Sequence, residues 1–414
     1  MAVEDTKPII VIGAGLVGLT LAQGLKKAGF DFRIYDRDNS IDERPAGWGI
    51  TMDWAMPSLQ ACLPPEVFAQ IPSIQVNPKS GHKADDRYRF LNLETGEEKS
   101  SVPASTLYRL NRKKFRHLLA TDIEVNWGRR CTGFDTTDDG VVVHFADGTR
   151  IEGSLLLAVD GKNSTVKRQL IGEESARLNP LPVGFIGLTL KMPREQMQPF
   201  LDIHPVIWQG CHPGTGYFVF FSALSTPETN GSAAAAGGEY YEGQFNMSWM
   251  VDRHGETPRT APEQIAKAKG AAVAGTGMFP TLRQAILGIP DDSPALGIKL
   301  EDWPTQRWPS RGGRVTLLGD AAHTMTMYRG EAANHGIYDA VELVRQLQQW
   351  RGGAKSREEA LRDYQLEVAE RTYEAVLLSR YACLESHDLD NMSEESNVLN
   401  VRIHSAEKSV RGHI

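Results

Sequence analysis

The spacing of hydrophobic and polar positions changes several times along the chain, and each spacing predicts a different element. A short apolar run at residues 8–13 predicts a buried strand, and apolar residues at helical spacing over 16–28 predict the helix after it. Gly29 ends that pattern, and residues 32–36 predict a second strand. The order strand, glycine turn, helix and strand is typical of a dinucleotide-binding α/β unit.

Further along, helical and strand-like patterns alternate. Residues 110–120 have helical spacing, whereas residues 123–159 predict a β-meander with a turn at Asp147-Gly148 and a buried run at its end. Between 180 and 300, strand-like segments are separated by connectors rich in Pro, Gly and Ser, which predicts a second, sheet-rich unit. A buried strand returns at 314–320, and the remainder is predicted to be mainly helical to about residue 387.

These patterns predict an α/β fold with a Rossmann-like first domain, a second, sheet-rich domain and C-terminal helices. A chain of 414 residues is long enough for more than one core. The expected boundaries are 1–75, 100–180 and 300–350 for the first domain, 76–99 and 181–299 for the second, and 351–414 for the C-terminal helical segment and tail.

Composition and charge exclude several classes of protein. With 45 Lys and Arg against 52 Asp and Glu and no basic run, nucleic acid is not an expected partner. The start of the chain is acidic and polar, and no window holds the roughly 18 apolar residues that a membrane span needs, so a cytoplasmic protein without a membrane partner is predicted. The 4 cysteines have no paired spacing, which predicts free thiols and no metal site. Monomer and homodimer both remain open.

The first glycine-rich turn has the spacing GxGxxG. Gly13 permits the tight turn, Gly15 lets a pyrophosphate approach the backbone, and Gly18 lets helix and strand pack closely. Asp36 closes the second strand, where its carboxylate can hold ribose hydroxyls, and Arg37 beside it either stacks on an adenine or is a solvated surface residue. The turn predicts a dinucleotide site but leaves NAD and FAD open.

Two later motifs decide between these cofactors. Asp160-Gly161 follows one buried strand, and Gly319-Asp320 follows another, with the loop 330–334 after it. In order and spacing, the GxGxxG, DG and GD motifs resemble those of the group A flavoprotein monooxygenases, the family similar to para-hydroxybenzoate hydroxylase. Arg112 stands where that family has an arginine that contacts FAD. The resemblance covers most of the chain, from about residue 9 to 340.

The resemblance implies where FAD binds. Asp160 and Asp320 would contact the cofactor, the segment 44–50 around Gly49 resembles the loop that lies against the flavin, and the helix beginning near residue 331 would point its amides at the flavin ring. The implied cofactor residues are Gly13, Gly15, Gly18, Asp36, Arg37, Gly49, Arg112, Asp160, Gly319, Asp320, Gly330, Ala332, Ala333 and Asn334. Three positions depart from the family's usual pattern: Met327 replaces a proline, Ala332 a glycine and Asp36 a glutamate.

The same resemblance implies the activity. It predicts a monooxygenase that uses NAD(P)H and O2 to hydroxylate or epoxidise an aromatic or unsaturated small molecule through a C4a-hydroperoxyflavin. There is no second GxGxxG, so NAD(P)H is expected only as a transient co-substrate. The loop at residues 329–335 is similar to that of fungal-type members, which favours a secondary metabolite as substrate.

Alternating aromatic residues in the second unit have two interpretations. They are most often core residues, but they can also line a substrate pocket. The candidate pocket residues are Trp208, His212, Tyr217, Phe221, Phe245 and Met247. No Ser–His–Asp order and no metal-ligand spacing emerges, His323 is expected to be structural, and the catalytic residues stay unknown.

Four alternatives share this scaffold. A flavin-dependent halogenase is disfavoured because its WxWxIP signature is not apparent in the sequence. A reductase and a Baeyer–Villiger oxygenase remain open, as does a non-catalytic FAD protein, because all of them would share the cofactor motifs.

Overall fold

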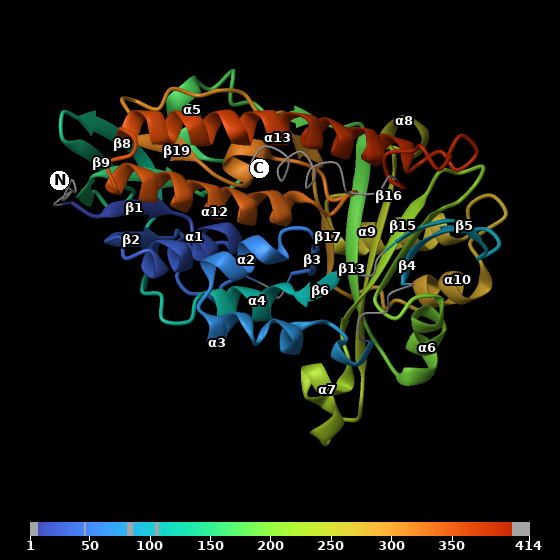
Figure 1. Ribbon diagram of the computed structural model, residues 1–414. Helices are drawn as coiled ribbons and strands as arrows, with labels where there is room; N and C mark the ends of the chain where they lie inside the picture. Colours follow the sequence, from blue (N-terminus) through green and yellow to red (C-terminus); the bar gives the residue numbers. More distant parts are fainter. Residues whose placement is uncertain (1–6, 45–46, 81–85, 104–106, 400–414) are drawn as a thin grey trace.

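The computed structural model describes residues 7–44, 47–80, 86–103 and 107–399, and its elements gather around two large sheets (Figure 1). The first sheet is parallel, with the strand order β19-β11-β1-β2-β7. Its strands are β1 (Ile9–Ile12), β2 (Phe32–Tyr35), β7 (Val125–Asn126), β11 (Leu155–Ala158) and β19 (Val315–Leu317). Every residue of β1, β11 and β19 is buried, as expected of parallel strands covered on both faces.

Helices pack beside this sheet and against one another. They are α1 (Leu16–Lys27), α2 (Met56–Cys62), α4 (Arg112–Leu119), α12 (Ala332–Arg351) and α13 (Arg357–Glu385). A Cβ added to Gly24 of α1 would lie 3.1 Å from Val344 of α12, so the two helices approach closely. The 29-residue helix α13 runs alongside α12 (Figure 1).

The region predicted as one meander belongs to two sheets. Only β8 (Cys131–Thr137), β9 (Gly140–Phe145) and β10 (Arg150–Gly153) form an antiparallel sheet. Strands β7 and β11, which flank them in the sequence, join the parallel sheet instead. The prediction of a single meander over 123–159 is therefore wrong, because strand-like spacing does not reveal the partner of a strand.

The helix predicted from residue 110 begins later. Residues Tyr108–Asn111 form β6, which pairs with β3 (Gly49–Met52). The side chain of Asn111 then accepts a hydrogen bond from the backbone of Lys114, which caps α4. The first two residues of the apolar pattern thus belong to a strand.

The second large sheet has the order β17-β13-β16-β15-β14-β4-β5 and is antiparallel except for the pair β14 and β4. Its strands are β4 (Arg87–Asn92), β5 (Glu98–Pro103), β13 (Val183–Met192), β14 (Ile207–Cys211), β15 (Phe218–Ser225), β16 (Tyr241–Met250) and β17 (Ala295–Gly297). The predicted α/β fold class with a second, sheet-rich unit and C-terminal helices is confirmed.

Helices that the sequence analysis did not predict cover one face of this sheet: α6 (Arg194–Ile203), α9 (Ala261–Ala272) and α10 (Pro280–Leu287). Their apolar residues join those of the strands in one buried cluster. The other face of the sheet is turned toward the parallel-sheet unit (Figure 1). The strand β5 extends beyond the boundary predicted at residue 100, and the division into domains itself stays a prediction.

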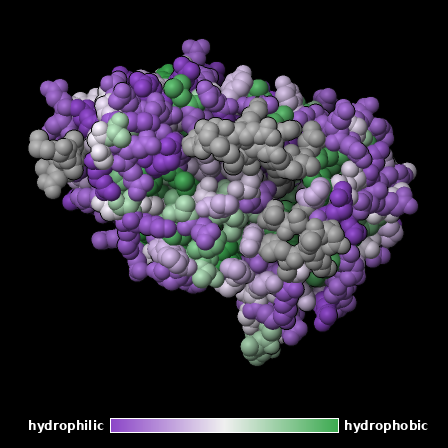
Figure 2. Space-filling model, viewed as in Figure 1, coloured by the Kyte–Doolittle hydropathy of each residue, from purple (hydrophilic) through white to green (hydrophobic). Residues whose placement is uncertain are grey.

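Short elements complete the described chain. They are α3 (Pro65–Phe68), η1 (Ile71–Ile74), η2 (Pro78–Ser80), α5 (Thr165–Ile171), β12 (Asn179–Pro180), α7 (Pro227–Asn230), η3 (Ser232–Ala234), α8 (Val251–His254), β18 (Glu301–Asp302) and α11 (Asp320–His323). Within the described ranges, no helix combines the length and apolar character needed to cross a membrane. The face shown in Figure 2 is mostly hydrophilic, with smaller hydrophobic patches between the polar groups.

Candidate functional site

A cavity of about 510 Å³ lies where the parallel strands end and the helices α1 and α12 begin. This is the usual position of a ligand in an open α/β sheet. It brings together ten of the predicted cofactor residues: Gly13, Gly15, Gly18, Asp36, Arg37, Arg112, Asp160, Asp320, Ala332 and Ala333. Two further lining residues, Arg44 and Ile50, belong to the segment 44–50 that was predicted to lie against the flavin. Lining residues that the sequence analysis did not select include Arg116, Arg129, Arg130, Lys162, Asn163 and Thr165.

The glycine turn forms one wall of the cavity. Gly13 has a φ of +111°, and a Cβ there would lie 2.2 Å from the Val159 carbonyl oxygen. A Cβ on Gly18 would lie 1.9 Å from the Gly13 oxygen, whereas one on Gly15 would have nothing within 4 Å. The first and third glycines are therefore needed for packing, and the second leaves room for a ligand near the backbone.

The start of α1 offers free donors to this space. Gly15 is its N-cap residue, no side chain caps the helix, and the first turn carries no acidic residue. The backbone N–H groups of the first turn of a helix have no partner within the helix, and the helix dipole adds a partial positive charge. An anionic group of a ligand is the natural partner at this position.

Asp36 has a double role at the edge of the cavity. Its Oδ2 accepts from the backbone N–H of Ala14 at 2.6 Å, and its Oδ1 accepts from that of Asp38 at 2.9 Å. Arg116 supports the same turn, since its Nε donates to the Ala14 carbonyl at 3.0 Å. The carboxylate is thereby oriented by the backbone while it lines the cavity.

The cavity is rich in positive charge. Seven Lys and Arg side chains line it, against three aspartates. Burial and the neighbouring guanidinium groups of Arg116 and Arg44 lower the pKa of Arg112. Repulsion between these cations is relieved when an anion binds among them, so the lining is suited to phosphate groups.

Two aspartates stand on the opposite wall. Asp160 accepts from the backbone N–H of Thr165 at 2.9 Å through Oδ2, while its Oδ1 has no hydrogen-bond partner among the described residues. Burial raises the pKa of Asp160, and it also raises the pKa of Asp320 against the opposing effect of nearby cations. An acceptor oriented by the backbone but lacking a donor is suited to a hydroxyl group of a ligand.

Behind these aspartates lies a buried cation that the sequence did not reveal. The Lys167 Nζ has no hydrogen-bond partner in the described part of the chain and sits 4.4 Å from the centre of the Trp303 ring. Burial lowers the pKa of Lys167 to about 8, although Asp160 and Asp320 oppose this effect. Lys167 therefore adds positive potential behind the wall without lining it.

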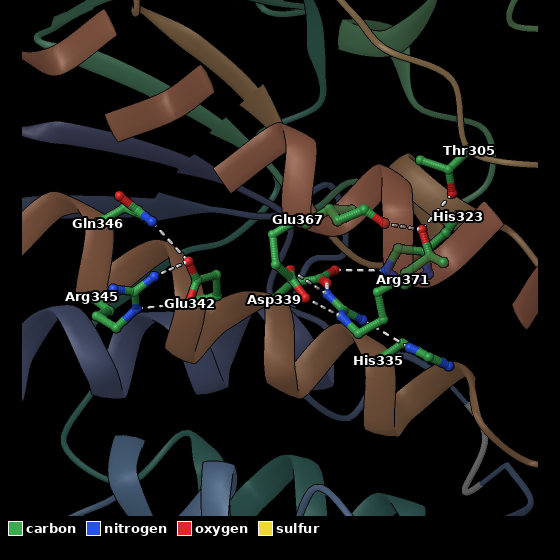
Figure 3. A network of polar contacts seen from close by, with 11 residues as sticks. Thr305, His323, His335, Asp339, Glu342, Arg345, Gln346, Glu367 and Arg371 are labelled. Carbon is green, nitrogen blue, oxygen red and sulfur yellow. Dashed lines mark hydrogen bonds and ion pairs between the residues drawn. The ribbon is translucent and has the colours of Figure 1, made fainter. Parts of the chain in front are cut away.

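A buried polar network holds in place the wall of the cavity that carries Asp320 (Figure 3). The Asp339 carboxylate on α12 accepts from the Gly319 backbone N–H at 2.8 Å and lies 2.6 Å from the His323 Nε2. Its other oxygen pairs with Arg371 of α13 at 2.7 Å. Although burial opposes it, His323 and Arg371 hold the pKa of Asp339 below its usual range. Sequence patterns had not singled out Asp339 or Arg371, which lie on separate helices.

The same arginine fixes His335. Arg371 donates from Nη1 to the His335 Nδ1 at 2.8 Å, as Figure 3 shows. An arginine only donates, so Nδ1 is an acceptor and the proton of the neutral ring is on Nε2. Burial and the charge of Arg371 lower the pKa of His335 well below its usual value. His335 is thus a neutral donor beside the start of α12.

The four remaining predicted cofactor residues, Gly49, Gly319, Gly330 and Asn334, do not line the cavity. They support segments that do. Asn334 donates from Nδ2 to the Thr51 carbonyl at 3.1 Å and accepts from the Asp53 N–H at 3.1 Å, which joins α12 to β3. Gly49 lies next to the lining residue Ile50, and Gly330 with a φ of +65° turns the chain into α12.

The predicted pocket residues lie elsewhere. Trp208, Tyr217, Phe221, Phe245 and Met247 belong to the cluster under α6, α9 and α10. Each is at most 4% exposed. His212, also buried, has its Nε2 3.3 Å from the Gly277 carbonyl oxygen. Of the two interpretations left open, the structure favours the core, because alternate residues of a strand face opposite sides and this side is covered by the helices.

The other face of the same sheet carries polar side chains among buried apolar ones. Arg109 of β6 reaches it, donating to the Ser222 Oγ at 3.0 Å and to the Thr51 Oγ1 at 2.9 Å. Gln244 accepts from the Gly49 backbone N–H at 3.4 Å. These contacts place the sheet beside the segment that lines the cavity, and no spacing in the sequence indicated them.

The sequence of this chain is similar to those of known proteins. Residues 6–207 and 299–378 match the family described as FAD binding domain. The FAD-dependent monooxygenase dbaB of Emericella nidulans is 44% identical over 83% of this chain and 87% of its own length. The chain belongs to the FAD-dependent monooxygenases. The monooxygenase cctM of Talaromyces islandicus is 34% identical over 83% of each chain.

Solved structures show the same fold at lower identity. Klebsiella pneumoniae HpxO complexed with FAD and uric acid has a TM-score of 0.71 and 20% identity, over 98% of this chain and 95% of that one. PqsL of P. aeruginosa in complex with 2-aminobenzoylacetate has a TM-score of 0.71 and 17% identity, over 92% and 97%. The monooxygenase fold is therefore common to proteins with different ligands.

The residues present in this monooxygenase fit FAD. The space at Gly15, the cation surplus and the free amides of α1 are suited to a diphosphate. The Asp36 carboxylate and the unpartnered oxygen of Asp160 are suited to hydroxyl groups. The family assignment and the donor set thus agree on the cofactor.

Proposed function

We propose that this monooxygenase uses NAD(P)H and O2 to hydroxylate or epoxidise an aromatic or unsaturated small molecule, a secondary metabolite. The observation that carries the proposal is the cavity in which the glycine turn, Arg112, Asp160 and Asp320 meet, next to the face of the second sheet that carries Gln244. HpxO with uric acid and PqsL with 2-aminobenzoylacetate are relatives in fold that bind cyclic ligands, which supports a ring-shaped substrate.

Different residues would bind different parts of the cofactor. The first turn of α1 and Arg112 would hold the diphosphate, Asp36 the ribose of the adenosine, and Asp160 with Asp320 the remaining hydroxyl groups. Bound FAD supplies the acceptor for the hydride of NAD(P)H and the centre that activates O2. The protein's own contribution is binding, orientation and electrostatics.

Two features of the chain would serve the chemistry. The helix α12 begins at Ala332 without a side-chain cap, so its first amides can stabilise negative charge that develops beside them. The neutral His335, one turn later, is held by Arg371 as a donor and not as an acid. The protein thereby favours an anion at this end of the cavity.

A spectrum of the purified protein tests this proposal. We expect two visible flavin bands that bleach when NADPH or NADH is added without oxygen, and faster when a phenol is present. After oxygen is admitted, a product heavier by one oxygen atom would distinguish oxygenation from halogenation or simple reduction. A colourless protein that FAD cannot reconstitute would contradict the cofactor, and a yellow protein that neither nicotinamide bleaches would contradict the proposed reductant.

A further inference from the structure

The loop that precedes α12 carries a buried ion pair. The Arg329 Nε donates to the Glu331 Oε2 at 2.7 Å, and the two side chains are only 6% and 3% exposed. Glu331 is the N-cap residue of α12, and the two residues after it, Ala332 and Ala333, line the cofactor cavity. Both charges therefore lie, shielded from water, at the end of the cavity where α12 begins.

Stability alone does not explain why a charged pair is kept at this place. The cost of taking two charges out of water offsets most of their attraction, so an apolar pair of the same size often stabilises a fold equally well. An acidic N-cap residue usually accepts a hydrogen bond from the first turn of its helix. Within the described ranges, the Glu331 side chain makes no such bond to α12. What remains is the effect of the two charges on a group that binds beside them.

The C-terminal segment of the described chain fixes the arginine. The Arg329 Nη1 donates to the Asn397 carbonyl oxygen. Asn397 in turn donates from its backbone nitrogen and from Nδ2 to the two carboxylate oxygens of Glu385, at 2.7 Å each. Glu385 is the last residue of α13, so the segment 386–399 folds back from that helix to reach the arginine. The guanidinium group is thus directed toward Glu331 by a contact outside its own loop.

Two further contacts anchor the loop 326–331 itself. The Tyr328 hydroxyl donates to the Ser248 Oγ of β16 at 2.7 Å. The Thr326 Oγ1 lies 2.7 Å from the Ser379 Oγ of α13. Both anchors come shortly before the ion pair in the chain, so the pair has a fixed position relative to the start of α12.

The charge of Arg329 acts on the first turns of α12. Burial and the charge of Arg371 lower the pKa of His335, and the positive charge of Arg329 adds to this effect. Charges in the interior of a protein are screened much less than charges in water. A change in the balance between Arg329 and Glu331 is therefore expected to alter the potential at this end of the cavity.

We propose that Arg329 is a positioning residue of this monooxygenase: it holds Glu331 and balances its charge, so that the start of α12 can accept the negative charge that FAD gains on reduction. This inference rests on the proposed function, in which FAD is reduced in the cavity. The glycine turn and Arg112 would bind the diphosphate, which leaves the end of the cavity at Ala332 and Ala333 for the flavin ring.

The electrostatics of this end favour the assignment. The free amides of the first turn of α12 attract negative charge, whereas an unbalanced carboxylate at Glu331 would repel it. With Arg329 in place the pair is neutral as a whole, and the attraction by the amides remains. The pair would thus set how strongly the protein prefers reduced FAD over oxidised FAD.

The midpoint potential of bound FAD tests the inference. The FAD-loaded protein is reduced with dithionite at pH 8.5 beside a reference dye, so neither NAD(P)H nor a substrate is required. Glu331→Gln keeps an acceptor for Arg329 but leaves its cation unbalanced. We expect this variant to prefer reduced FAD roughly 3- to 10-fold more than the wild type does, which raises the potential by about 15 to 30 mV for a two-electron couple.

Arg329→Gln should have the opposite effect. It leaves the Glu331 carboxylate unbalanced, so the potential is expected to fall by a similar factor. In the double variant Arg329→Gln, Glu331→Gln both charges are absent, and the potential should return to that of the wild type. A purely structural role of the pair would not give shifts of opposite sign.

Arg345→Gln is the matched control, because it breaks the ion pair with Glu342 further along the same helix. Its potential should equal that of the wild type. Each single variant is compared with the wild type, so the sign of one shift carries the test if the other variant folds poorly.

The outcomes separate the two proposals. Shifts of the same sign in the two single variants, or shifts no larger than that of Arg345→Gln, would overturn the role of the pair. Failure of NAD(P)H to bleach the flavin would instead contradict the proposed function, and reduction by dithionite does not depend on that step.

Discussion

The Gly319 backbone N–H donates to the Asp339 carboxylate across 2.8 Å, and this bond joins the GD turn to the middle of α12. The same oxygen meets His323, and the other meets Arg371. The wall of the cavity that carries Asp320 is thus held by one side chain twenty residues further along the chain. Removal of the Asp339 charge is therefore expected to affect the cofactor site, although Asp339 does not line the cavity.

Asp339→Asn tests this connection. The substitution leaves the buried Arg371 without its full counter-charge, so we expect a loss of about 3–5 kcal/mol in the free energy of unfolding. Because asparagine has one acceptor oxygen in place of two, either Gly319 or Arg371 loses its partner, and FAD should also bind more weakly. Urea unfolding and flavin fluorescence titration measure the two effects.

Glu342→Gln is the matched control on the same helix. Glu342 is 5% exposed, but its partner Arg345 is 39% exposed, so the loss of this pair should cost less than the loss of the fully buried charge at Asp339. An equal loss of stability in both variants would contradict the larger contribution that is expected of Asp339.

Gly18→Ala tests the glycine turn. Its Cβ would lie 1.9 Å from the Gly13 oxygen, so α1 must move away from the strand. We expect a loss of about 1–3 kcal/mol in stability and FAD affinity reduced by at least about 10-fold. Gly270→Ala is the control, because this helical glycine of α9 has open space around it and alanine should stabilise the helix by up to about 1 kcal/mol.

Arg112→Gln tests the positive charge of the cavity. A hydrogen bond to a charged group contributes about 1.5–3 kcal/mol, so FAD should bind roughly 10- to 100-fold more weakly, with little change in stability. In the control Lys113→Gln, an exposed ion pair with Asp42 is lost and FAD affinity should not change. Fluorescence titration at two salt concentrations gives both constants. Equal affinities of the two variants would argue against a diphosphate at Arg112.

His387 predicts a loss of stability in acid. Its Nε2 lies 2.9 Å from the Ser248 Oγ, and burial lowers its pKa from 6.5 to about 4. Between these values the unfolded chain binds a proton that the folded protein does not, so stability falls as the pH falls. The contribution between pH 7.5 and pH 5 is about 2 kcal/mol.

The variant His387→Gln should remove this contribution. Urea unfolding at pH 7.5 and pH 5 is expected to show a smaller difference in the variant than in the wild type, by about 2 kcal/mol. An unchanged difference would show that His387 is protonated in the folded protein at pH 5.

How far the sequence predicts this site depends on the range of its interactions. Several cavity residues lie within a few residues of a strand end: the glycine turn, Asp36, Asp160 and Asp320. Their spacing along the chain therefore predicts their local geometry. Spacing and the resemblance to a known family therefore located ten of the residues that line the cavity. Arg129, Arg130 and Lys162 line the cavity too, but nothing in their local sequence distinguishes them from surface cations.

The second unit shows what the spacing of residues along the sequence does not predict. The alternation at Phe221 and Phe245 predicted strands with two distinct faces, but the side of the sheet that is covered by α6, α9 and α10 depends on helices whose patterns were weak. The large aromatic side chains of these strands thus lie in the core. The contact of Gln244 with Gly49 on the opposite face likewise depends on how the sheet packs against the first unit.

The sequence by itself determined the cofactor and the family, because these depend on short motifs in a fixed order, and strand-like spacing predicted the sheet-rich part of the chain. Only the tertiary structure decided which face of the second sheet meets the cavity, and which buried charges, Asp339 and Arg371 among them, hold its wall. The physical reason is that a side chain's partners across sheets and helices are set by packing between distant segments, which local periodicity does not encode.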